Sequence, residues 1–260
     1  MSFNFQSPFR EKIGCSAVPG VTPVRLLGVN AGITTTFETA WDNSNAYAFL
    51  AANMASPTIV SSSANDAAAG TGARTVRVTG VDSLYAIQTE VVTLNGVTPV
   101  ALVNNYMSIN SIVVLTAGSG GLNAGTLTLA AGGTTHAFMA IGLNTTTSYI
   151  YTVPAGYGLI IENLTCSLGA STTAGAGQII LESTTDSVGA SGLKTRRYHS
   201  TGIQTTGTML TYVDFKIPMR FAPKTQLQAQ ILVSAGPTLG IAYSDAFLYK
   251  IDSTVQDYFV

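Results

Sequence analysis

Residues 73–83 read ARTVRVTGVDS, and this stretch decides the fold class. In an extended chain Val76 and Val78 lie on one face. The opposite face carries Thr75, Arg77 and Thr79. Apolar and polar residues that alternate with a period of two are typical of a β-strand with one buried face. The stretch therefore predicts a strand of a half-buried β-sheet.

Short runs of the same kind recur from residue 58 onward, separated by Gly, Asn, Asp and Ser. Strands are predicted over 109–116 and 226–233, and the Asn95-Gly96 dipeptide, which tolerates positive φ, predicts a two-residue hairpin turn. Residues of the second run that we expect to face outward are Gln226, Gln228 and Gln230. Many short strands with turns about every 8–12 residues predict an all-β protein built as a sandwich or barrel, with a jelly roll favoured.

The chain divides into an arm and two sandwich units. Residues 1–35 contain three prolines and four glycines without a helical period. We expect them to form an extended N-terminal arm that lies against the body or reaches a neighbouring subunit. A faint internal repeat aligns 109–129 with 161–181 as strand, small-residue loop and strand, which favours two related units. We place two β-sandwich (jelly-roll-like) units at 36–132 and 133–260.

One segment lacks a strand pattern. Residues 37–54 come nearest to a helical pattern, but the large residues of this segment do not share one face. These residues are Trp41, Tyr47, Phe49 and Leu50.

Charge is sparse along the whole chain. The 260 residues include 12 Lys and Arg against 13 Asp and Glu, and only 10% are charged, compared with about 25% in ordinary soluble domains. Because neutralising phosphates requires clustered cations, we expect no nucleic-acid partner. No apolar run approaches the roughly 18–20 residues of a membrane-spanning helix, so no membrane partner is expected either.

No catalytic or cofactor site is predicted, so we do not expect an enzyme. His136 and His199 are the only histidines, and neither has a Ser, Cys or carboxylate at a catalytic spacing. The glycine-rich sequences at 70–74 and 118–121 lack the strand, turn and helix context of a phosphate-binding loop. We expect both to be flexible hairpin tips.

No metal site is predicted from the cysteines and carboxylates. Cys15 and Cys166 are the only cysteines, and they favour two free thiols over one disulfide. The places where a loop could hold calcium are Asp82 and the Asn65-Asp66 pair.

The only basic cluster is the candidate binding site, and it consists of Lys194, Arg196, Arg197 and Tyr198. Such a cluster would contact an acidic partner surface or a glycan, and otherwise it is a solvated loop. Tyrosines that would stack on a glycan, if they lie in exposed loops, are Tyr149, Tyr151, Tyr157 and Tyr198. A surface of uncharged polar residues suits burial between subunits, so we expect a homo-oligomer, with a trimer favoured.

Long stretches of the chain resemble a known class of proteins. Residues 61–129 resemble a segment that recurs in virion structural proteins of tailed bacteriophages, and the matching pieces are SAND, AAGTGARTVRV, TEVVTLNG, INSIVV, AGSGG and NAGTLTL. Residues 151–168, 215–236 and 241–251 resemble the jelly-roll module often found behind that segment, with its VPAG turn and a Pro-Lys-Thr sequence before an alternating strand. None of these motifs is catalytic.

The resemblance covers roughly residues 37–252 and implies a protein located in the virion and assembled in the host cytoplasm. From it we expect a capsid decoration or cement protein that binds the major capsid protein or other virion proteins, with the arm as its anchor. One alternative is a tail, fibre or vertex protein that binds a host cell-surface glycan. A further alternative is a double jelly-roll major capsid protein.

Overall fold

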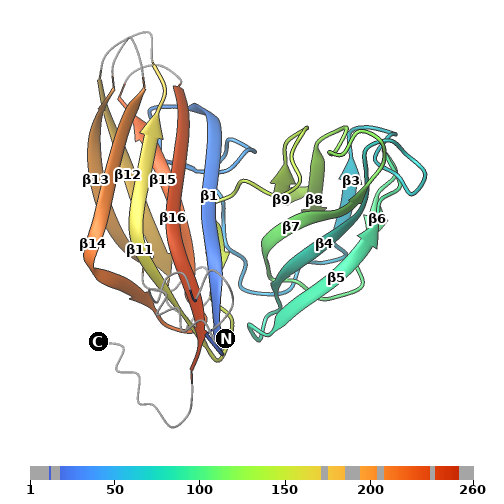
Figure 1. The fold of residues 1–260 in the computed structure, drawn as a ribbon, viewed down its shortest axis with the longest axis horizontal. Coiled ribbons are helices and arrows are strands. Elements are labelled where there is room, and N and C mark those ends of the chain that lie inside the picture. Colours follow the sequence, from blue (N-terminus) through green and yellow to red (C-terminus); the bar gives the residue numbers. More distant parts are fainter. Residues whose placement is uncertain are drawn as a thin grey trace, which may run out of the picture.

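The computed structural model describes residue 12 and residues 18–170, 175–184, 194–203, 208–234 and 238–251. Sixteen strands lie within these residues, and their pairings are antiparallel (Figure 1). The predicted all-β fold with sandwich units is confirmed. Within the same residues, no helix is long and apolar enough to cross a membrane.

One body is built from both ends of the chain, and we call it the terminal sandwich. Its strands are β1 (Val21–Ile33), β2 (Glu38–Thr39), β10 (Ile150–Thr152), β11 (Tyr157–Leu168), β12 (Gly175–Thr184), β13 (Lys194–Ile203), β14 (Met209–Phe221), β15 (Gln226–Val233) and β16 (Thr238–Lys250). One sheet has the order β1-β16-β11-β14. The other has the order β10-β15-β12-β13, and β2 also pairs with β15.

The other body is an insertion between β2 and β10, and we call it the inserted sandwich. Its strands are β3 (Thr58–Ser61), β4 (Ala73–Val81), β5 (Ile87–Thr93), β6 (Val100–Ala101), β7 (Ser108–Ala117), β8 (Leu127–Ala131) and β9 (Thr134–Met139). They form sheets of order β6-β3-β8-β9 and β5-β4-β7. Figure 1 shows the two bodies beside each other, with β1 on the side that faces the inserted sandwich.

The predicted division into arm, first unit and second unit differs from this arrangement. Residues 21–33 of the predicted arm form β1, which pairs with the last strand, β16. Strand β9 belongs to the inserted sandwich and lies beyond the predicted boundary at residue 132. The remaining arm residues before position 18 lie outside the described part of the chain, apart from Lys12.

The glycine and proline content of β1 has a structural reason. Pro23 is tolerated because β1 is at the edge of its sheet, where a missing N–H breaks no ladder on the open side. A Cβ at Gly28 would lie 1.9 Å from the Ala40 carbonyl oxygen, so this position requires glycine. The two residues that indicated an arm are therefore compatible with a strand.

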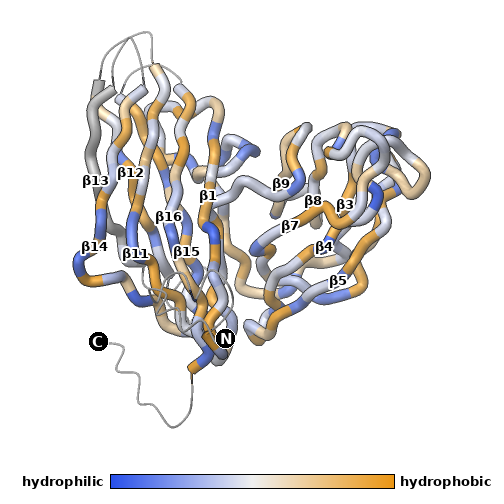
Figure 2. The backbone as a smooth tube through the Cα atoms, viewed as in Figure 1, coloured by the Kyte–Doolittle hydropathy of each residue, from blue (hydrophilic) through white to orange (hydrophobic). Residues whose placement is uncertain are grey.

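Each sandwich has its own apolar core. Burial alternates along β16, where Ala242, Ser244, Ala246 and Leu248 are buried and their neighbours are not. Figure 2 shows apolar residues distributed along the strands of both bodies. In the inserted sandwich Val76 and Val78 are fully buried, as their alternation predicts.

The predicted outward face of β15 is wrong. Gln226, Gln228 and Gln230 are only 2%, 2% and 8% exposed. The Gln226 amide donates to the Leu50 carbonyl at 3.3 Å, and the Gln228 amide donates to the Tyr47 carbonyl at 3.5 Å. These glutamines are buried because residues 38–50 cross that face, and the amides of Gln226 and Gln228 bond to backbone groups of those residues.

The predicted hairpin at Asn95-Gly96 is also wrong. Gly96 has the expected positive φ of 59°, but β5 and β6 belong to different sheets. A Cβ at Gly96 would lie 3.0 Å from the Ala64 Cα. The turn therefore carries the chain from one sheet to the other and packs on the loop before β4.

Candidate binding pocket between the two sandwiches

The contacts between the two sandwiches include residues of the VPAG, Pro-Lys-Thr and INSIVV sequences. The backbone N–H of Ala155, in the VPAG turn, donates to the Tyr85 carbonyl at 2.9 Å, and the Lys224 ammonium lies 5.6 Å from the centre of the Tyr85 ring. Asn110 of β7 and Thr152 of β10 exchange two hydrogen bonds of 2.9 Å. These contacts hold the inserted sandwich against the terminal one.

Next to these contacts, residues 41–55 cross from one sandwich to the other without forming a helix. The Trp41 indole N–H donates to the Asn45 carbonyl at 2.7 Å, which closes a tight turn. The rings of Trp41 and Tyr47 pack edge to face with centroids 5.3 Å apart, and those of Tyr47 and Phe49 do so at 5.1 Å. Edge-to-face packing is a favoured geometry for aromatic pairs, so the crossing segment has its own ordered core.

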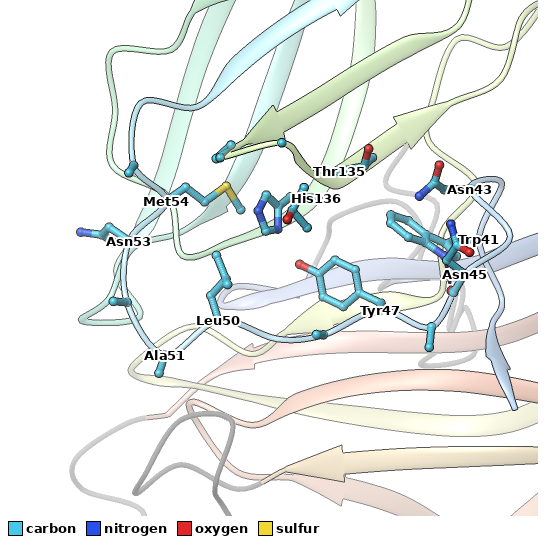
Figure 3. Close-up of a pocket in the computed structure, with 18 residues that line it drawn as sticks. Trp41, Asn43, Asn45, Tyr47, Leu50, Ala51, Asn53, Met54, Thr135 and His136 are labelled. Carbon is cyan, nitrogen blue, oxygen red and sulfur yellow. Dashed lines mark hydrogen bonds between the residues drawn. The ribbon is translucent and has the colours of Figure 1, made fainter.

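A cavity of about 960 Å³ lies between this crossing segment and the hairpin that joins β8 to β9 (Figure 3). Its lining side chains include Asn43, Asn45, Asn53, Thr134, Thr135 and Met54. No Asp, Glu, Lys or Arg is among the lining residues that the structure describes. The volume lies within the range of about 300–1,000 Å³ that is usual for small-molecule sites.

Two residues that line this cavity each carry a fully buried polar side-chain atom. His136 is 4% exposed and Tyr47 is 5% exposed. Neither the His136 Nδ1 nor the Tyr47 hydroxyl forms a hydrogen bond of ordinary length with any described residue. Figure 3 shows the Tyr47 hydroxyl turned toward the end of the cavity where His136 lies.

Burial shifts the titration of both groups toward the neutral form. Desolvation lowers the pKa of His136 below its usual value of 6.5. Desolvation also raises the pKa of Tyr47 to about 12, and a weak interaction with Ser108 opposes this only in part. At neutral pH the cavity therefore offers an uncharged imidazole and an uncharged phenol.

The predicted basic binding cluster is in a strand, not a loop. Lys194, Arg196, Arg197 and Tyr198 belong to β13, where they pair in register with Thr184, Glu182, Leu181 and Ile180 of β12. Their side chains lie outside the described part of the chain. The binding role of this cluster stays a prediction.

Tyr149, one of the tyrosines expected to stack on a glycan, is not an exposed loop residue. It is fully buried, and its hydroxyl donates to Ser244 at 2.7 Å. Tyr151 and Tyr157 are half-buried, and both belong to strands, β10 and β11. None of the three lines the cavity.

Asp66 of the SAND motif holds loops together. Its carboxylate accepts hydrogen bonds from the Ser61 hydroxyl at 2.6 Å and from the backbone N–H groups of Ala73, Ala124 and Gly125 at 2.7, 2.8 and 2.8 Å. Both oxygens are thus engaged by the protein, and Asp66 is fully buried. Among the described residues, no group of three His, Cys, Asp or Glu side chains could hold a metal ion.

The glycine-rich sequences pack against each other beside Asp66. The N–H of Gly118 donates to the Gly72 carbonyl at 2.8 Å, and a Cβ on Gly118 would lie 2.2 Å from the Gly70 carbonyl oxygen. They are therefore close-packed backbone, not flexible hairpin tips as predicted. Glycine is required here because the two backbones touch.

Cys166 is a free thiol in the core of the terminal sandwich. Desolvation raises its pKa to about 12, so it is protonated and unreactive at neutral pH. Cys15 lies outside the described residues.

Sequence reasoning missed the cavity. The aromatic and asparagine residues at 41–53 mark it in the sequence, but His136 joins them only because the β8–β9 hairpin folds over the crossing segment. The sequence around a lone histidine in a strand does not indicate that residues 41–55 will lie beside it.

Comparisons with known proteins identify no family. No protein-family model and no curated protein sequence matches the chain. Among solved structures, the chain is similar to that of the Gt strain of infectious bursal disease virus, with 13% identity and a TM-score of 0.26 over 94% of this chain and 78% of the other. It is also similar to the structure of the Gx strain, with 14% identity and a TM-score of 0.25 over 98% of this chain and 80% of the other. A VP2 subviral particle of the same virus gives 11% identity and a TM-score of 0.12 over 97% of this chain and 89% of the other. TM-scores this low carry no argument about function.

Proposed function

We propose that this chain is a non-enzymatic virion structural protein, a capsid decoration or cement protein that stabilises the lattice through subunit contacts. The observation that carries the proposal is a group of exposed apolar side chains at one end of the outer face of the sheet β1-β16-β11-β14. On its edge strand β14, Leu210 is 65% exposed, Tyr212 is 59% exposed and Ile217 is 87% exposed.

The register of the sheet places Leu210 and Tyr212 in rows that cross all four strands, whereas Ile217 lies where the register between β11 and β14 shifts. One row consists of Leu210, Ser167, Ile241 and Val29. The next row consists of Tyr212, Thr165, Tyr243 and Leu27. Each row is apolar on β14, β16 and β1 and carries a hydroxyl side chain on β11. Exposed apolar side chains that gather on an outer face are typical of a protein interaction surface.

The partner that we propose for this face is the major capsid protein or another virion protein. The chain itself would be a homo-oligomer, with a trimer favoured, and it would not bind nucleic acid or a membrane. A protein that binds only the assembled lattice stabilises it by mass action, about 2.7 kcal/mol per site at a concentration 100 times the dissociation constant. The sparse charge of the chain supports this role, because few charged groups would have to lose water at the contact.

Two alternatives remain within the same class. A double jelly-roll major capsid protein is favoured by the presence of two sandwiches in one chain. A tail, fibre or vertex protein that binds a glycan is favoured by the uncharged cavity between the sandwiches.

The copy number of the chain in purified virions separates these roles. Quantitative mass spectrometry relative to the major capsid protein should give hundreds of copies for a decoration protein. A few tens of copies would favour a vertex or tail protein, and absence from particles would contradict the virion role altogether.

Charged substitutions test the apolar face directly. We expect Leu210→Lys combined with Tyr212→Lys to abolish binding to particles that lack this chain, with an unchanged circular dichroism spectrum. The matched control is Val103→Lys, because Val103 is 90% exposed but lies in the inserted sandwich. Equal binding by the double variant and the control would contradict the assignment of this face.

A deletion tests the anchoring role of the N-terminus, provided that it ends before β1 begins at Val21. Removal of 1–30 would delete most of β1 and with it the buried Leu26. Removal of 1–17 spares every described strand. If these residues anchor the chain, the shorter deletion abolishes particle binding and leaves the melting temperature unchanged.

A further inference from the structure

A second cavity lies along the edge of β1 that faces the inserted sandwich (Figure 1), and we call it the edge groove. Its volume is about 510 Å³, and one wall consists of the five consecutive residues 22–26 of β1. The other walls come mainly from β4, β5, β7 and β10. Because neighbouring side chains of a strand point to opposite faces, a cavity that touches five residues in a row runs along the edge of that strand.

The backbone of β1 has unpaired groups along this edge. The Gly20 carbonyl accepts from the Lys250 N–H at 2.8 Å, whereas the Val29 N–H donates to the Thr147 carbonyl, away from β16, at 3.4 Å. In an antiparallel pair, alternate residues direct both backbone groups toward the partner strand or away from it. Odd-numbered residues of β1 therefore point away from β16. One of them is Arg25, and no described backbone group bonds to its N–H or C=O on this side.

Such an edge selects an extended polypeptide as its occupant. Unpaired groups of an edge strand accept a further strand, whose main-chain hydrogen bonds supply affinity. Pro23 lacks an N–H, but its carbonyl remains an acceptor. Apolar side chains of the groove that keep exposed surface include Ile87, which is 46% exposed, and the half-buried Val24 and Tyr151. They would pack against side chains of an added strand.

The charge of the groove indicates an acidic occupant. Its charged lining residues are Arg25 and Arg77, both exposed, and no Asp or Glu is among the lining residues that the structure describes. Arg77 lies between Val91 and Val113 in its sheet, so no charge in its own row neutralises it. A carboxylate that enters the groove would therefore gain a cationic partner.

Arg25 is the less available of the two arginines. It lies opposite Asp245 of β16, and its guanidinium carbon is 5.8 Å from the centre of the Tyr243 ring. The Asp245 carboxylate, however, already accepts hydrogen bonds from the Asn163 amide and the Tyr243 hydroxyl. We therefore expect Arg77 to contribute most of the recognition of an acidic side chain.

The sequence of this chain contains a segment with the required chemistry. Residues 252–260, which follow the described part of the chain, read DSTVQDYFV. They include Asp252 and Asp257, no basic residue, and no Gly or Pro. Five of these nine residues are Thr, Val, Tyr or Phe, which favour strands. Residues 1–17 carry two basic residues against one acidic residue, so charge complementarity favours 252–260.

The position of β16 favours a segment from a second copy. β16 lies between β1 and β11, and the Ile251 N–H donates to the Gly156 carbonyl, on the side of β11, at 2.9 Å. The chain therefore leaves its sheet on the other side of β1 from the groove. The Val21 N–H donates to the Val18 carbonyl at 3.2 Å, so a turn also occupies the foot of β1. A segment from another copy meets neither obstacle.

From these observations we infer that residues 252–260 of a second copy add a strand to β1 in the edge groove, with their aspartates facing Arg77 and Arg25. This contact deepens the homo-oligomer of the proposed function by naming the segment and the groove that join the copies. It does not require the chain to belong to a virion.

Removal of residues 252–260 tests the contact. The deletion spares every described strand, so the circular dichroism spectrum should not change. Light scattering should show an oligomer for the full chain and a monomer for the shortened chain. Removal of residues 1–17 is the matched control, because it shortens the other end of the chain, and it should leave the oligomer intact.

A peptide separates occupation of the groove from other effects of the deletion. The acetylated, fluorescently labelled peptide DSTVQDYFV should bind the shortened chain with one site per chain, as measured by fluorescence anisotropy. Arg77→Gln in the chain, or Asn in place of both aspartates in the peptide, should raise the dissociation constant about threefold to tenfold. Arg220→Gln removes the same charge from an exposed position of β14 and should leave the constant unchanged.

Backbone recognition is tested with a modified peptide. N-methylation at both Val255 and Gln256 removes a donor toward β1 whichever of the two residues faces the edge. This peptide should not bind at concentrations that saturate the shortened chain with the unmodified one. Equal binding of the two peptides would contradict strand addition.

Two further results would overturn the inference. Equal oligomeric states of the full and shortened chains would exclude exchange between copies, and peptide binding to the shortened chain alone would then assign the segment to its own copy. An unchanged affinity in Arg77→Gln would place the peptide outside the groove. Because particle binding is measured separately, a monomeric chain that still binds particles would overturn this contact and leave the proposed virion role intact.

Discussion

Asp66 and His136 are both buried polar side chains of the inserted sandwich, but their surroundings differ. The Asp66 carboxylate accepts four hydrogen bonds, whereas the His136 Nδ1 has no partner among the described residues. The first site is complete by itself and holds three loops in place. The second is incomplete and belongs to a residue that lines a cavity. A satisfied polar network rigidifies a fold, while a buried polar group without a partner destabilises it.

The difference has a simple origin in the chain. Around Asp66, backbone N–H groups at loop ends converge because glycines let the loops approach closely. Around His136, the neighbouring segment 41–55 presents side chains that already bond within the segment, such as Trp41 to Asn45. The same sandwich therefore combines one closed polar site with one open site.

The largest expected effect comes from breaking the closed site. Asp66→Ala leaves four buried donors without an acceptor and should lower the free energy of unfolding by about 3–5 kcal/mol. Urea denaturation measures this loss. Asn65→Ala is the control, because the Asn65 side chain is exposed, and it should change stability by less than about 0.5 kcal/mol. Equal stabilities of the two variants would show that Asp66 does not organise the loops.

The next effect comes from separating the glycine-rich loops beside Asp66. Gly118→Ala places a Cβ against the Gly70 carbonyl and should lower the free energy of unfolding by about 1–3 kcal/mol through overpacking. Gly32→Ala, at a position with no atom within 4 Å of an added Cβ, should be nearly neutral. Thermal denaturation of both variants compares them, and a stable Gly118→Ala variant would mean that the loops can shift apart.

A smaller effect distinguishes a satisfied hydroxyl from an unsatisfied one. Tyr149→Phe loses a hydrogen bond to Ser244 and should lower the free energy of unfolding by about 1 kcal/mol. Tyr47→Phe loses no hydrogen bond of ordinary length and should leave stability unchanged or raise it. Destabilisation by Tyr47→Phe as large as that by Tyr149→Phe, measured in urea, would show that the interaction with Ser108 is a full hydrogen bond.

The smallest effect is a pH dependence from His136. Its pKa is lowered in the folded state, so the unfolded chain binds more protons between that value and 6.5. The free energy of unfolding should therefore decrease as the pH falls below 6.5 and level off below the folded-state pKa. The groups facing His136 in the cavity include no carboxylate or cation, and the titratable one is Tyr47, which stays neutral in this range. His136→Phe should remove this part of the pH dependence, and an unchanged pH profile in that variant would assign it elsewhere.

Much of the strand content was predictable from the sequence. The alternation around Val76 and Val78 corresponds to β4, the run at 109–116 to β7, and the run at 226–233 to β15. These predictions succeed because side chains alternate between faces in any strand, so one buried face leaves a local pattern.

The errors share a physical cause, which is a contact between residues distant in sequence. Residues 21–33 were predicted to be an arm because their own sequence does not indicate the pairing with β16. The glutamines of β15 were predicted to be exposed because their own strand does not indicate that residues 38–50 cover them. The Asn95-Gly96 turn has the expected φ, but its direction is decided by packing against Ala64. A local sequence pattern carries no information about a partner that lies far along the chain.

The sequence by itself determined the all-β class, the positions of many strands and the shortage of charge, because period-two alternation and composition are local properties. Only the tertiary structure decided that one sandwich is inserted into the other, that the SAND aspartate is a closed hydrogen-bonding site, and that His136 and Tyr47 meet at one cavity. These features depend on which distant segments come together and on which buried polar atoms then find partners. That outcome is a property of packing in three dimensions.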